Sequence, residues 1–471
     1  MDKSIESNNK ALVQLLFMIL LTLLTQGVSL IKASVTAANF GATVEMDAFN
    51  FSNSIGTFIF SFIGTGVTTV LIPAIINRKE KKSIDNFITV LYGISLLCVI
   101  ILFFFRRFIA SLFSSNSTQF IEIACSIMLI TLIAQFLNTI LSVFNAVFQC
   151  EEKFNIPKVI TLITTSILTL LVFLNKDMSI YQFAIFIFIT SALNLIIQGA
   201  FVYRYNFRYK PVIDFKDEEF KKMITIFIPT MFSAGLYQIS LLTDSLISSK
   251  LGPGQISILS YSNNIMNMIN LLLLSNLMTY IYPKVTKQIN QNNGSNQLFN
   301  YMIFFNAIMF LMVCGFIVVG KEGIVLLYQR GKFDSSITQL VYSCTFIYII
   351  GLPINVMRDL VYRYFYAKGN TKSTFKNSIS ASIVNIIVSI ALASFIGLYG
   401  VVIGTVITSI FSFTSIMIRL KHQYNVKIDK NYVFIENSKI VISSVIVIVS
   451  IIFIKSIIII TNPLLSIVLF G

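Results

Sequence analysis

The sequence is poor in charge. Of its 471 residues only 12% are charged, whereas 56% are hydrophobic and 43 are phenylalanine. This charged fraction is roughly half that of an ordinary soluble domain. Apolar runs recur from end to end, and many reach the length of about 18 residues that crosses a bilayer core of about 30 Å. The composition excludes a soluble protein, and the continuous rather than alternating runs exclude a membrane barrel.

Residues that bind metals or carry out catalysis are also scarce. The single histidine, His422, falls in a charged loop, and no phosphate loop or Walker sequence occurs. The cysteines show no CxxC spacing, so they indicate neither a disulfide nor a metal site. We therefore expect no enzyme, no metal centre and no ATP hydrolysis. The five cysteines are Cys98, Cys125, Cys150, Cys314 and Cys344.

The remaining sequence predicts an all-α polytopic membrane protein. Polar or Gly/Pro clusters separate about thirteen predicted transmembrane helices. A tail after residue 461 is too short to cross again. The predicted spans are 11–36, 49–76, 84–105, 118–148, 158–174, 178–203, 222–249, 256–282, 297–320, 335–366, 376–396, 400–419 and 439–461.

Basic residues are concentrated in alternate loops. Most of the 35 Lys and Arg residues lie on one side, among them "RKEKK" at 78–82, the loop at 204–222 and the segment 419–439. Cytoplasmic loops of membrane proteins carry such an excess, which places the N-terminus in the cytoplasm. The net charge of +15 is therefore a topology signal first. Attraction to membrane lipids is its second use, and no nucleic-acid partner is needed to explain it.

The chain also repeats itself. "QGVSLIKASVTAANFG" from Gln26 matches "QISLLTDSLISSKLG" from Gln238, so that Gly41 aligns with Gly252. Internal repeats are typical of transporters. We expect two pseudo-symmetric lobes of six helices in parallel order. They are an N-lobe at 1–209 and a C-lobe at 210–430, followed by an additional C-terminal span at 431–471.

Two charged residues take equivalent positions in this repeat. Lys32 lies near the outer end of the first span and Asp244 near the middle of the seventh. Ionisable residues within spans are costly and usually face a cavity or a partner. A lysine can also extend its ammonium group to the lipid headgroups, so Lys32 has that second interpretation. Asp244 is too short to do so, and it is the stronger functional candidate.

The later spans contain four more charged residues. Arg358 and Asp359 are adjacent and point roughly 100° apart on a helix, which predicts that they do not form a simple pair and that one faces the interface between the lobes. Arg363 and Lys455 lie near span ends. Arg363 is expected to extend toward the membrane surface, and Lys455 either anchors at that surface or faces a cavity or partner within the protein.

Several motifs resemble those of a known family. "FGATVEMDAFNFSNSI" in the first half, and "LLYQRGKFDSS", "YIIGLPINVMRDLVYRYFYAKGNTKSTFKNS" and "GLYGVVIGTVITS" in the second, are similar in order and spacing to blocks of the MurJ/MviN family. That resemblance implies a flippase whose two six-helix lobes surround a central cavity. Its expected partner is an undecaprenyl-diphosphate-linked saccharide, either lipid II or a related surface-polysaccharide precursor. Translocation would proceed from the inner to the outer leaflet of a bacterial plasma membrane by alternating access.

The resemblance also implies a substrate site. Lys32 stands where the family has a cavity arginine, and Phe60 and Asn264 stand where it has two others. Arg358 completes the substrate-binding set, because a diphosphate attracts cations. A lysine supplies the charge without the two-pronged geometry of arginine.

A coupling site is implied in the same way. Asp244, Asn385 and Thr405 match a family pattern that binds a cation, and Ser389 takes the place of a second carboxylate. The expected coupling ion is a sodium ion or a proton. No other cofactor is expected.

Glycines and one aspartate define predicted structural positions. The family resemblance makes Gly41 to Asp47 a short outer turn, in which Asp47 caps the second helix. Gly64 and Gly66 in the second span permit local unwinding or close helix approach, or serve simple packing.

Two other functions remain open. One is a cation-coupled multidrug exporter of the same superfamily, for which the spans contain few carboxylates. The other is a non-transporting scaffold in a complex with wall-synthesis partners. A scaffold would tolerate replacement of Lys32 and Asp244, whereas a flippase would not.

Overall fold

The computed structural model describes residues 2–76, 80–114, 117–205, 207–270, 294–368, 370–426, 430–458 and 462–470. Within these ranges the regular elements are all helices, as the composition predicts. The chain divides into two compact units, Met1–Leu242 and Thr243–Gly471. The division falls inside one long helix. The predicted three-part division of the chain, at residues 209 and 430, stays a prediction.

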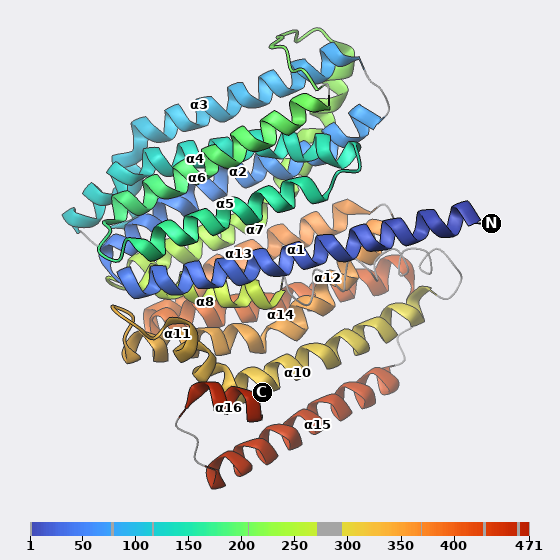
Figure 1. Cartoon of the computed structure of the whole chain (residues 1–471). Helices are drawn as coiled ribbons and strands as arrows, with labels where there is room; N and C mark the ends of the chain where they lie inside the picture. The colour runs from blue at the N-terminus through green and yellow to red at the C-terminus, as the bar shows by residue number, and fades with distance from the viewer. Residues whose placement is uncertain are drawn as a thin grey trace. The chain divides into compact units, whose positions relative to one another are not determined.

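The first unit is built around α4. Figure 1 shows α4 among its neighbours α2, α3 and α6, and α5 packs between α1 and α6. Side chains begin two of these helices: Ser117 accepts the Phe120 N–H, and Ser179 forms a reciprocal capping box with Gln182. The helices are α1 (Asp2–Phe40), α2 (Val44–Ile76), α3 (Lys81–Phe113), α4 (Thr118–Cys150), α5 (Asn155–Leu174) and α6 (Ile180–Arg204), and α7 (Glu218–Ser249) crosses into the second unit.

The turn between α1 and α2 differs from the prediction in one detail. Gly41 has a φ of 60°, which only glycine adopts without strain. Thr43, and not Asp47, caps α2: the Met46 N–H lies 3.4 Å from the Thr43 hydroxyl. Asp47 is buried in the first turn of α2, where its carboxylate suits the positive end of the helix dipole. The prediction that Asp47 caps α2 was therefore wrong, because the capping residue lies one turn earlier.

The second unit repeats the packing of the first. The same helix pairs are in contact in both units. The α2–α4 contact corresponds to α8–α11, and the α3–α4 contact corresponds to those of α10 with α11 and α12. The α4–α6 contact corresponds to α12–α14, and the α5–α6 contact to α13–α14. Gly252 has a positive φ after α7, as Gly41 has after α1. Its helices are α8 (Gln255–Ile269), α10 (Gly294–Tyr328), α11 (Ser335–Ile350), α12 (Leu352–Ala367), α13 (Thr371–Ile396), α14 (Leu398–Tyr424), α15 (Lys430–Ile457) and α16 (Pro463–Phe470).

One predicted span is broken. The segment 335–366 forms two helices, α11 and α12, which meet at Gly351 with a bend of 41°. Pro353 lies in the first turn of α12, where its missing N–H is tolerated. A Cβ at Gly351 would lie 3.1 Å from a methyl group of Val406, so α14 packs tightly against the break.

The described helices confirm a multi-pass membrane protein without fixing the number of spans. Nine of them are long and apolar enough to cross a bilayer, and ten if α11 and α12 form one span. The end of the predicted eighth span, beyond residue 270, lies outside the described residues. The count of about thirteen stays a prediction.

Helix α15 is attached to α10 by polar contacts along its length. Asn306 donates to Asn437, and the Cys314 thiol faces the Ser444 carbonyl. Near the far end, Lys455 pairs with Glu322 and donates to the Val318 carbonyl. The sequence left two interpretations open for Lys455, and the described contacts favour a partner within the protein over a surface anchor. The pattern missed Glu322 because the predicted span ended at residue 320, whereas α10 continues to Tyr328.

The ion pair gives a first prediction. The Lys455 and Glu322 side chains are only 28% and 26% exposed. Replacing Glu322 with leucine leaves an unpaired ammonium group in an apolar environment, which destabilises a membrane helix by up to about 3 kcal/mol. Replacing both residues with leucine removes both charges, and we expect stability close to the original. Thermal unfolding of the purified protein in detergent measures both variants.

A second ion pair on α15 provides the control. Lys439 and Glu436 form an exposed pair one turn apart, with the lysine side chain 66% exposed. Changing Glu436 to leucine is expected to alter stability by about 0.5 kcal/mol or less. A double Glu322/Lys455 variant as unstable as the single Glu322 variant would contradict the role of the pair.

Candidate functional site

A buried polar cluster joins α7, α13 and α14 in the second unit. It contains Asp244 from α7, Asn385 and Ser389 from α13, and Thr405 from α14. The Thr405 hydroxyl lies 3.0 Å from Asp244 Oδ2, and Asn385 Nδ2 lies 3.4 Å from the hydroxyls of both Ser389 and Thr405. The structure therefore brings together all four residues of the predicted coupling site.

Two buried oxygen atoms of this cluster have no hydrogen-bond partner among the described residues. Asp244 and Asn385 are 2% and 1% exposed, and Oδ1 of each lacks a hydrogen bond to any described residue. Buried polar atoms are normally paired, so two orphaned oxygens on residues that both contact Thr405 point to a ligand. Carboxylate and amide oxygens are the ligand type that hard cations prefer. The donor set thus fits a small cation or a proton on Asp244.

The cluster is suited to a singly charged ion. Asp244 is the only ionisable group among its four residues. Among the described residues, no group of three or more His, Cys, Asp or Glu side chains is placed to hold a metal ion. A site for a divalent ion usually gathers more negative charge than one carboxylate provides.

Two glycines allow α14 to approach α13 closely at this point. A Cβ at Gly404 would lie 2.5 Å from Ser389 Oγ, and a Cβ at Gly400 would lie 2.3 Å from the carbonyl carbon of Leu392. Glycines four residues apart let helix backbones pack against each other in membranes. This close approach holds Ser389 beside Thr405. "GLYGVVIGTV" contains the signal, but the sequence could not say which helix it faces.

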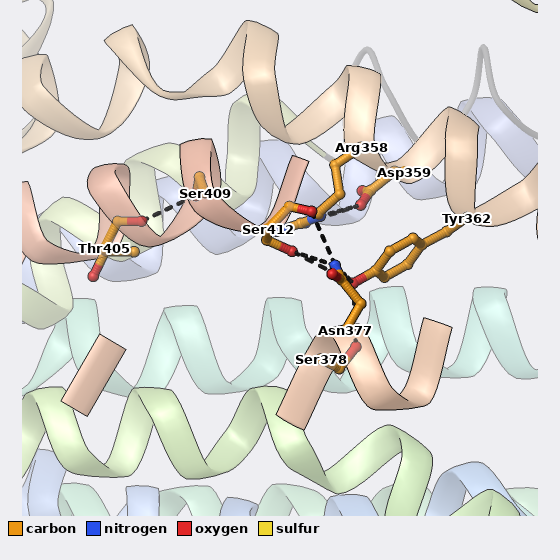
Figure 2. A network of polar contacts seen from close by, with 8 residues as sticks. All are labelled: Arg358, Asp359, Tyr362, Asn377, Ser378, Thr405, Ser409 and Ser412. Atoms are coloured by element: carbon orange, nitrogen blue, oxygen red, sulfur yellow. Dashed lines mark hydrogen bonds and ion pairs between the residues drawn. The ribbon is translucent and has the colours of Figure 1, made fainter. Parts of the chain in front are cut away.

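A second polar network lies further along α14. Figure 2 shows Asn377 of α13 between Tyr362 of α12 and Ser412 of α14. The Asn377 amide donates to the Tyr362 hydroxyl at 2.9 Å and lies 2.9 Å from Ser412 Oγ and 3.0 Å from the Ser412 carbonyl oxygen. Asn377 is fully buried. Asn377 was not predicted as a site residue, because it is uncharged and only ionisable residues stand out within apolar spans.

One face of α14 carries both groups of polar residues. Thr405, Ser409 and Ser412 are spaced by four and three residues, which places them on the same side of a helix. The Ser409 hydroxyl donates to the Thr405 carbonyl at 3.0 Å, and Ser412 belongs to the Asn377 network (Figure 2). This polar face of α14 connects the Asp244 cluster with the surroundings of Arg358.

Arg358 and Asp359 do form a pair. The guanidinium Nε and Nη2 atoms lie 3.0 and 2.9 Å from the same oxygen of Asp359. The prediction from their 100° separation was wrong, because a long arginine side chain reaches around the helix to its neighbour. Arg358 is therefore neutralised locally, and an anionic ligand would compete with Asp359.

The other predicted substrate residues are distributed over both units. Lys32 is half-buried on α1, and among the described residues no carboxylate pairs with its ammonium group. Phe60 is buried on α2, 4% exposed, and Asn264 is exposed on α8. Substrate binding by these residues stays a prediction. Gly64 and Gly66 lie within an uninterrupted α2, and a Cβ at Gly64 would meet no atom within 4 Å, so neither unwinding nor close approach is seen at Gly64.

Known proteins resemble this chain over nearly all of its length. Residues 36–469 match the model of a family described as "Lipid II flippase MurJ". Two curated relatives are called "Probable lipid II flippase MurJ". The one from Rickettsia prowazekii (strain Madrid E) is 21% identical over 88% of this chain and 83% of its own. The one from Vibrio cholerae (serotype O1, El Tor Inaba N16961) is 24% identical over 82% and 78%.

Solved structures show the same fold. "Lipid II flippase MurJ, inward closed conformation" superposes with a TM-score of 0.81 at 21% identity and covers 97% of this chain and 98% of that one. A multidrug resistance MATE family transporter of the MOP superfamily, in an inward-facing conformation, has a TM-score of 0.65 at 14% identity, over 86% of this chain and 96% of that one. Similarity at these identities indicates the fold and not the cargo.

Proposed function

The chain belongs to the MurJ family, and we propose that it carries an undecaprenyl-diphosphate-linked saccharide between the leaflets of a bacterial plasma membrane. The match to the family model over residues 36–469, which spans both units, is the observation that supports this most strongly. The cargo would be lipid II or a related wall or surface-polysaccharide precursor. The reaction moves a molecule across the membrane without making or breaking covalent bonds.

Cations would attract the diphosphate head of this cargo. Lys32 supports the proposal because its ammonium group has no carboxylate partner among the described residues, so its charge is available to a ligand. Arg358 would contribute more weakly, because its guanidinium group is already paired with Asp359, which competes with an anionic ligand. A diphosphate carries more negative charge than one carboxylate and competes well for a guanidinium group. We place the N-terminus in the cytoplasm on the distribution of basic loops, so the head would enter from that side.

The Asp244 cluster would couple transport to an ion. Asp244, Asn385, Ser389 and Thr405 would hold a sodium ion, or Asp244 alone would take up a proton. The bound ion would supply the positive charge that neutralises the buried carboxylate. Without it, Asp244 keeps a buried negative charge, and its Oδ1 has no hydrogen-bond partner among the described residues, which is unfavourable. Because these four residues lie on α7, α13 and α14, the packing of the three helices would depend on whether the ion is bound.

Depletion of an essential lipid II flippase tests the cargo. This chain, or its Lys32→Gln variant, is supplied as the replacement, and lipid II in the outer leaflet is measured directly. We expect the original chain to restore outer-leaflet lipid II and the variant to fail at equal membrane abundance. Absence of outer lipid II with the original chain present in the membrane would refute lipid II as cargo.

Two further outcomes separate the alternatives. No outer-leaflet lipid II in the depletion strain, together with Lys32 and Asp244 variants that replace the chain in its own cell as well as the original does, would indicate a scaffold, because a scaffold needs neither charge. Resistance to cationic drugs without lipid II transport would indicate an exporter like the MATE neighbours.

A further inference from the structure

The segment between α6 and α7 is fixed to α3. Residues 207–217 run without regular secondary structure apart from a short turn, and their side chains alternate between half-buried and exposed over 207–210 and 212–215. Asn86 exchanges two hydrogen bonds with the backbone of Asp214, at 2.7 and 3.1 Å. The Thr89 hydroxyl accepts the Val212 N–H at 3.1 Å and lies 2.9 Å from the Tyr209 hydroxyl. These contacts hold one side of the segment against the helix.

The position of this segment along α3 corresponds to a membrane boundary. Arg106 and Arg107 end the apolar run of α3 at one side. A helix needs about 20 residues to cross the hydrocarbon core, and counting that many back from Arg106 reaches Asn86. The residues that hold the segment, Asn86 and Thr89, therefore lie where the hydrocarbon core meets the headgroups on the opposite side.

The outward side of the segment combines apolar and basic residues. Ile213 and Phe215 are 67% and 66% exposed, although they lie outside the membrane-spanning helices. Arg208, Lys210 and Lys216 are exposed beside them, and the Arg208 guanidinium lies 5.4 Å from the centre of the Tyr203 ring. We call these five residues, Arg208, Lys210, Ile213, Phe215 and Lys216, the linker face.

The nearby acidic groups do not neutralise the linker face. Asp214 pairs with Lys82 at 2.7 Å, and this hydrogen bond lowers the pKa of the Asp214 carboxyl. Asp217 accepts the N–H groups of Glu219 and Phe220 at the start of α7. Glu218 and Glu219 pair with Lys221 and Lys222. Asp85 of α3 accepts a hydrogen bond from the Lys210 backbone and attracts the Lys210 ammonium group. No salt bridge joins Arg208, Lys210 or Lys216 to a described carboxylate, so Arg208 and Lys216 keep their full charge and Lys210 is balanced only in part.

We propose that the linker face is a binding site for anionic phospholipids. Ile213 and Phe215 enter the boundary between acyl chains and headgroups, while Arg208, Lys210 and Lys216 contact the phosphate and glycerol-phosphate groups. Exposed apolar side chains flanked by cations at this depth are the combination that interfacial segments use. Charge selects the lipid over a neutral one, because each basic residue near an anionic surface contributes about 1 kcal/mol, or about fivefold in binding.

The absence of tryptophan makes a direct test available. The chain contains no Trp, so a Phe215→Trp variant carries a single fluorescent reporter in the linker face. The full chain is reconstituted in vesicles of mixed phosphatidylcholine and phosphatidylglycerol, in which either one lipid or the other is brominated. We expect bromo-phosphatidylglycerol to quench the tryptophan more strongly than bromo-phosphatidylcholine at equal mole fraction. The corresponding preference in binding should be about fivefold or more, the effect of one cation.

Two matched controls isolate the cause. A Phe395→Trp variant places the reporter at an 85% exposed position near the end of α13, distant in sequence from basic residues, and should be quenched equally by the two lipids. Adding Arg208→Gln, Lys210→Gln and Lys216→Gln to Phe215→Trp should abolish the preference. Adding Lys372→Gln, Lys376→Gln and Lys421→Gln, an equal loss of exposed charge elsewhere, should leave it unchanged. High salt should weaken the preference.

Three results would overturn the proposal. Equal quenching of Phe215→Trp by both lipids would show contact without selection for charge. No quenching by either lipid would show that water or a protein partner covers the linker face. A preference that survives removal of its three cations would assign the selection to other residues.

Discussion

Replacing Asp244 with asparagine is expected to slow transport of the lipid-linked saccharide by about 5- to 150-fold, the range of a coupling free energy of about 1–3 kcal/mol. Asparagine keeps the size of the side chain and its contact with Thr405, but it removes the charge that an ion would neutralise. The rate at which outer-leaflet lipid appears in reconstituted vesicles, with and without an ion gradient, measures the effect. The variant should also lose the dependence of transport on that gradient.

The stability of the same variant distinguishes lost coupling from misfolding. Because Oδ1 of Asp244 has no hydrogen-bond partner among the described residues, removing its buried charge should leave Tm unchanged or raised. Sodium should raise the Tm of the original chain at constant ionic strength, since a ligand that binds only the folded state stabilises it. This increase should vanish in Asp244→Asn. If neither sodium nor pH affects the original chain differently from the variant, the cluster does not bind a coupling ion.

The second large effect is expected from the glycines of α14. Alanine at Gly404 would place its Cβ 2.5 Å from Ser389 Oγ and 2.9 Å from Ser389 Cα, so the two helices must separate. Overpacking of this kind destabilises a core by about 1–3 kcal/mol. Gly400→Ala should have a larger effect, because its Cβ would meet the backbone of Leu392, which cannot rotate away as a side chain can. Thermal unfolding in detergent measures both variants.

A glycine in open space serves as the comparison. Gly315 lies within α10, and a Cβ there would meet no atom within 4 Å. Gly315→Ala should stabilise the helix by about 0.5–1 kcal/mol, because alanine loses less backbone entropy than glycine. If Gly404→Ala were as harmless as Gly315→Ala, the close approach of α13 and α14 would not be required. Gly404→Ala should also lose the sodium-dependent increase in Tm, because it displaces Ser389.

Sequence reasoning was most successful where a single residue type decides the outcome. Continuous apolar runs predict helices in the membrane, and the described helices confirm this. Asp244 was identifiable because a short carboxylate in the middle of a span cannot reach the headgroups and therefore needs a partner within the protein. Its companions Asn385, Ser389 and Thr405 were located through family resemblance. The described residues place all four together, although their role with a cation remains a prediction.

The errors concern how far side chains reach and where helices end. Arg358 pairs with its neighbour Asp359 because a flexible side chain can depart from the direction of its Cα–Cβ bond. Glu322 was overlooked because α10 extends beyond the apolar run by more than a turn. Asn377 carries no charge, so a search for ionisable residues passed over it. Such features depend on distances between helices, which hydropathy does not report.

The break at Gly351 has a mechanical consequence. Val406 of α14 packs against that break, and the preceding residue, Thr405, donates its hydroxyl toward Asp244. Consecutive residues point about 100° apart on a helix, so α14 contacts two different neighbours at a single level. Any rotation or sliding of α14 alters the polar contact and the packing at the bend in the same movement. If Asp244 binds the proposed ion, we expect its occupancy to be linked to the angle between α11 and α12 through this one turn of α14.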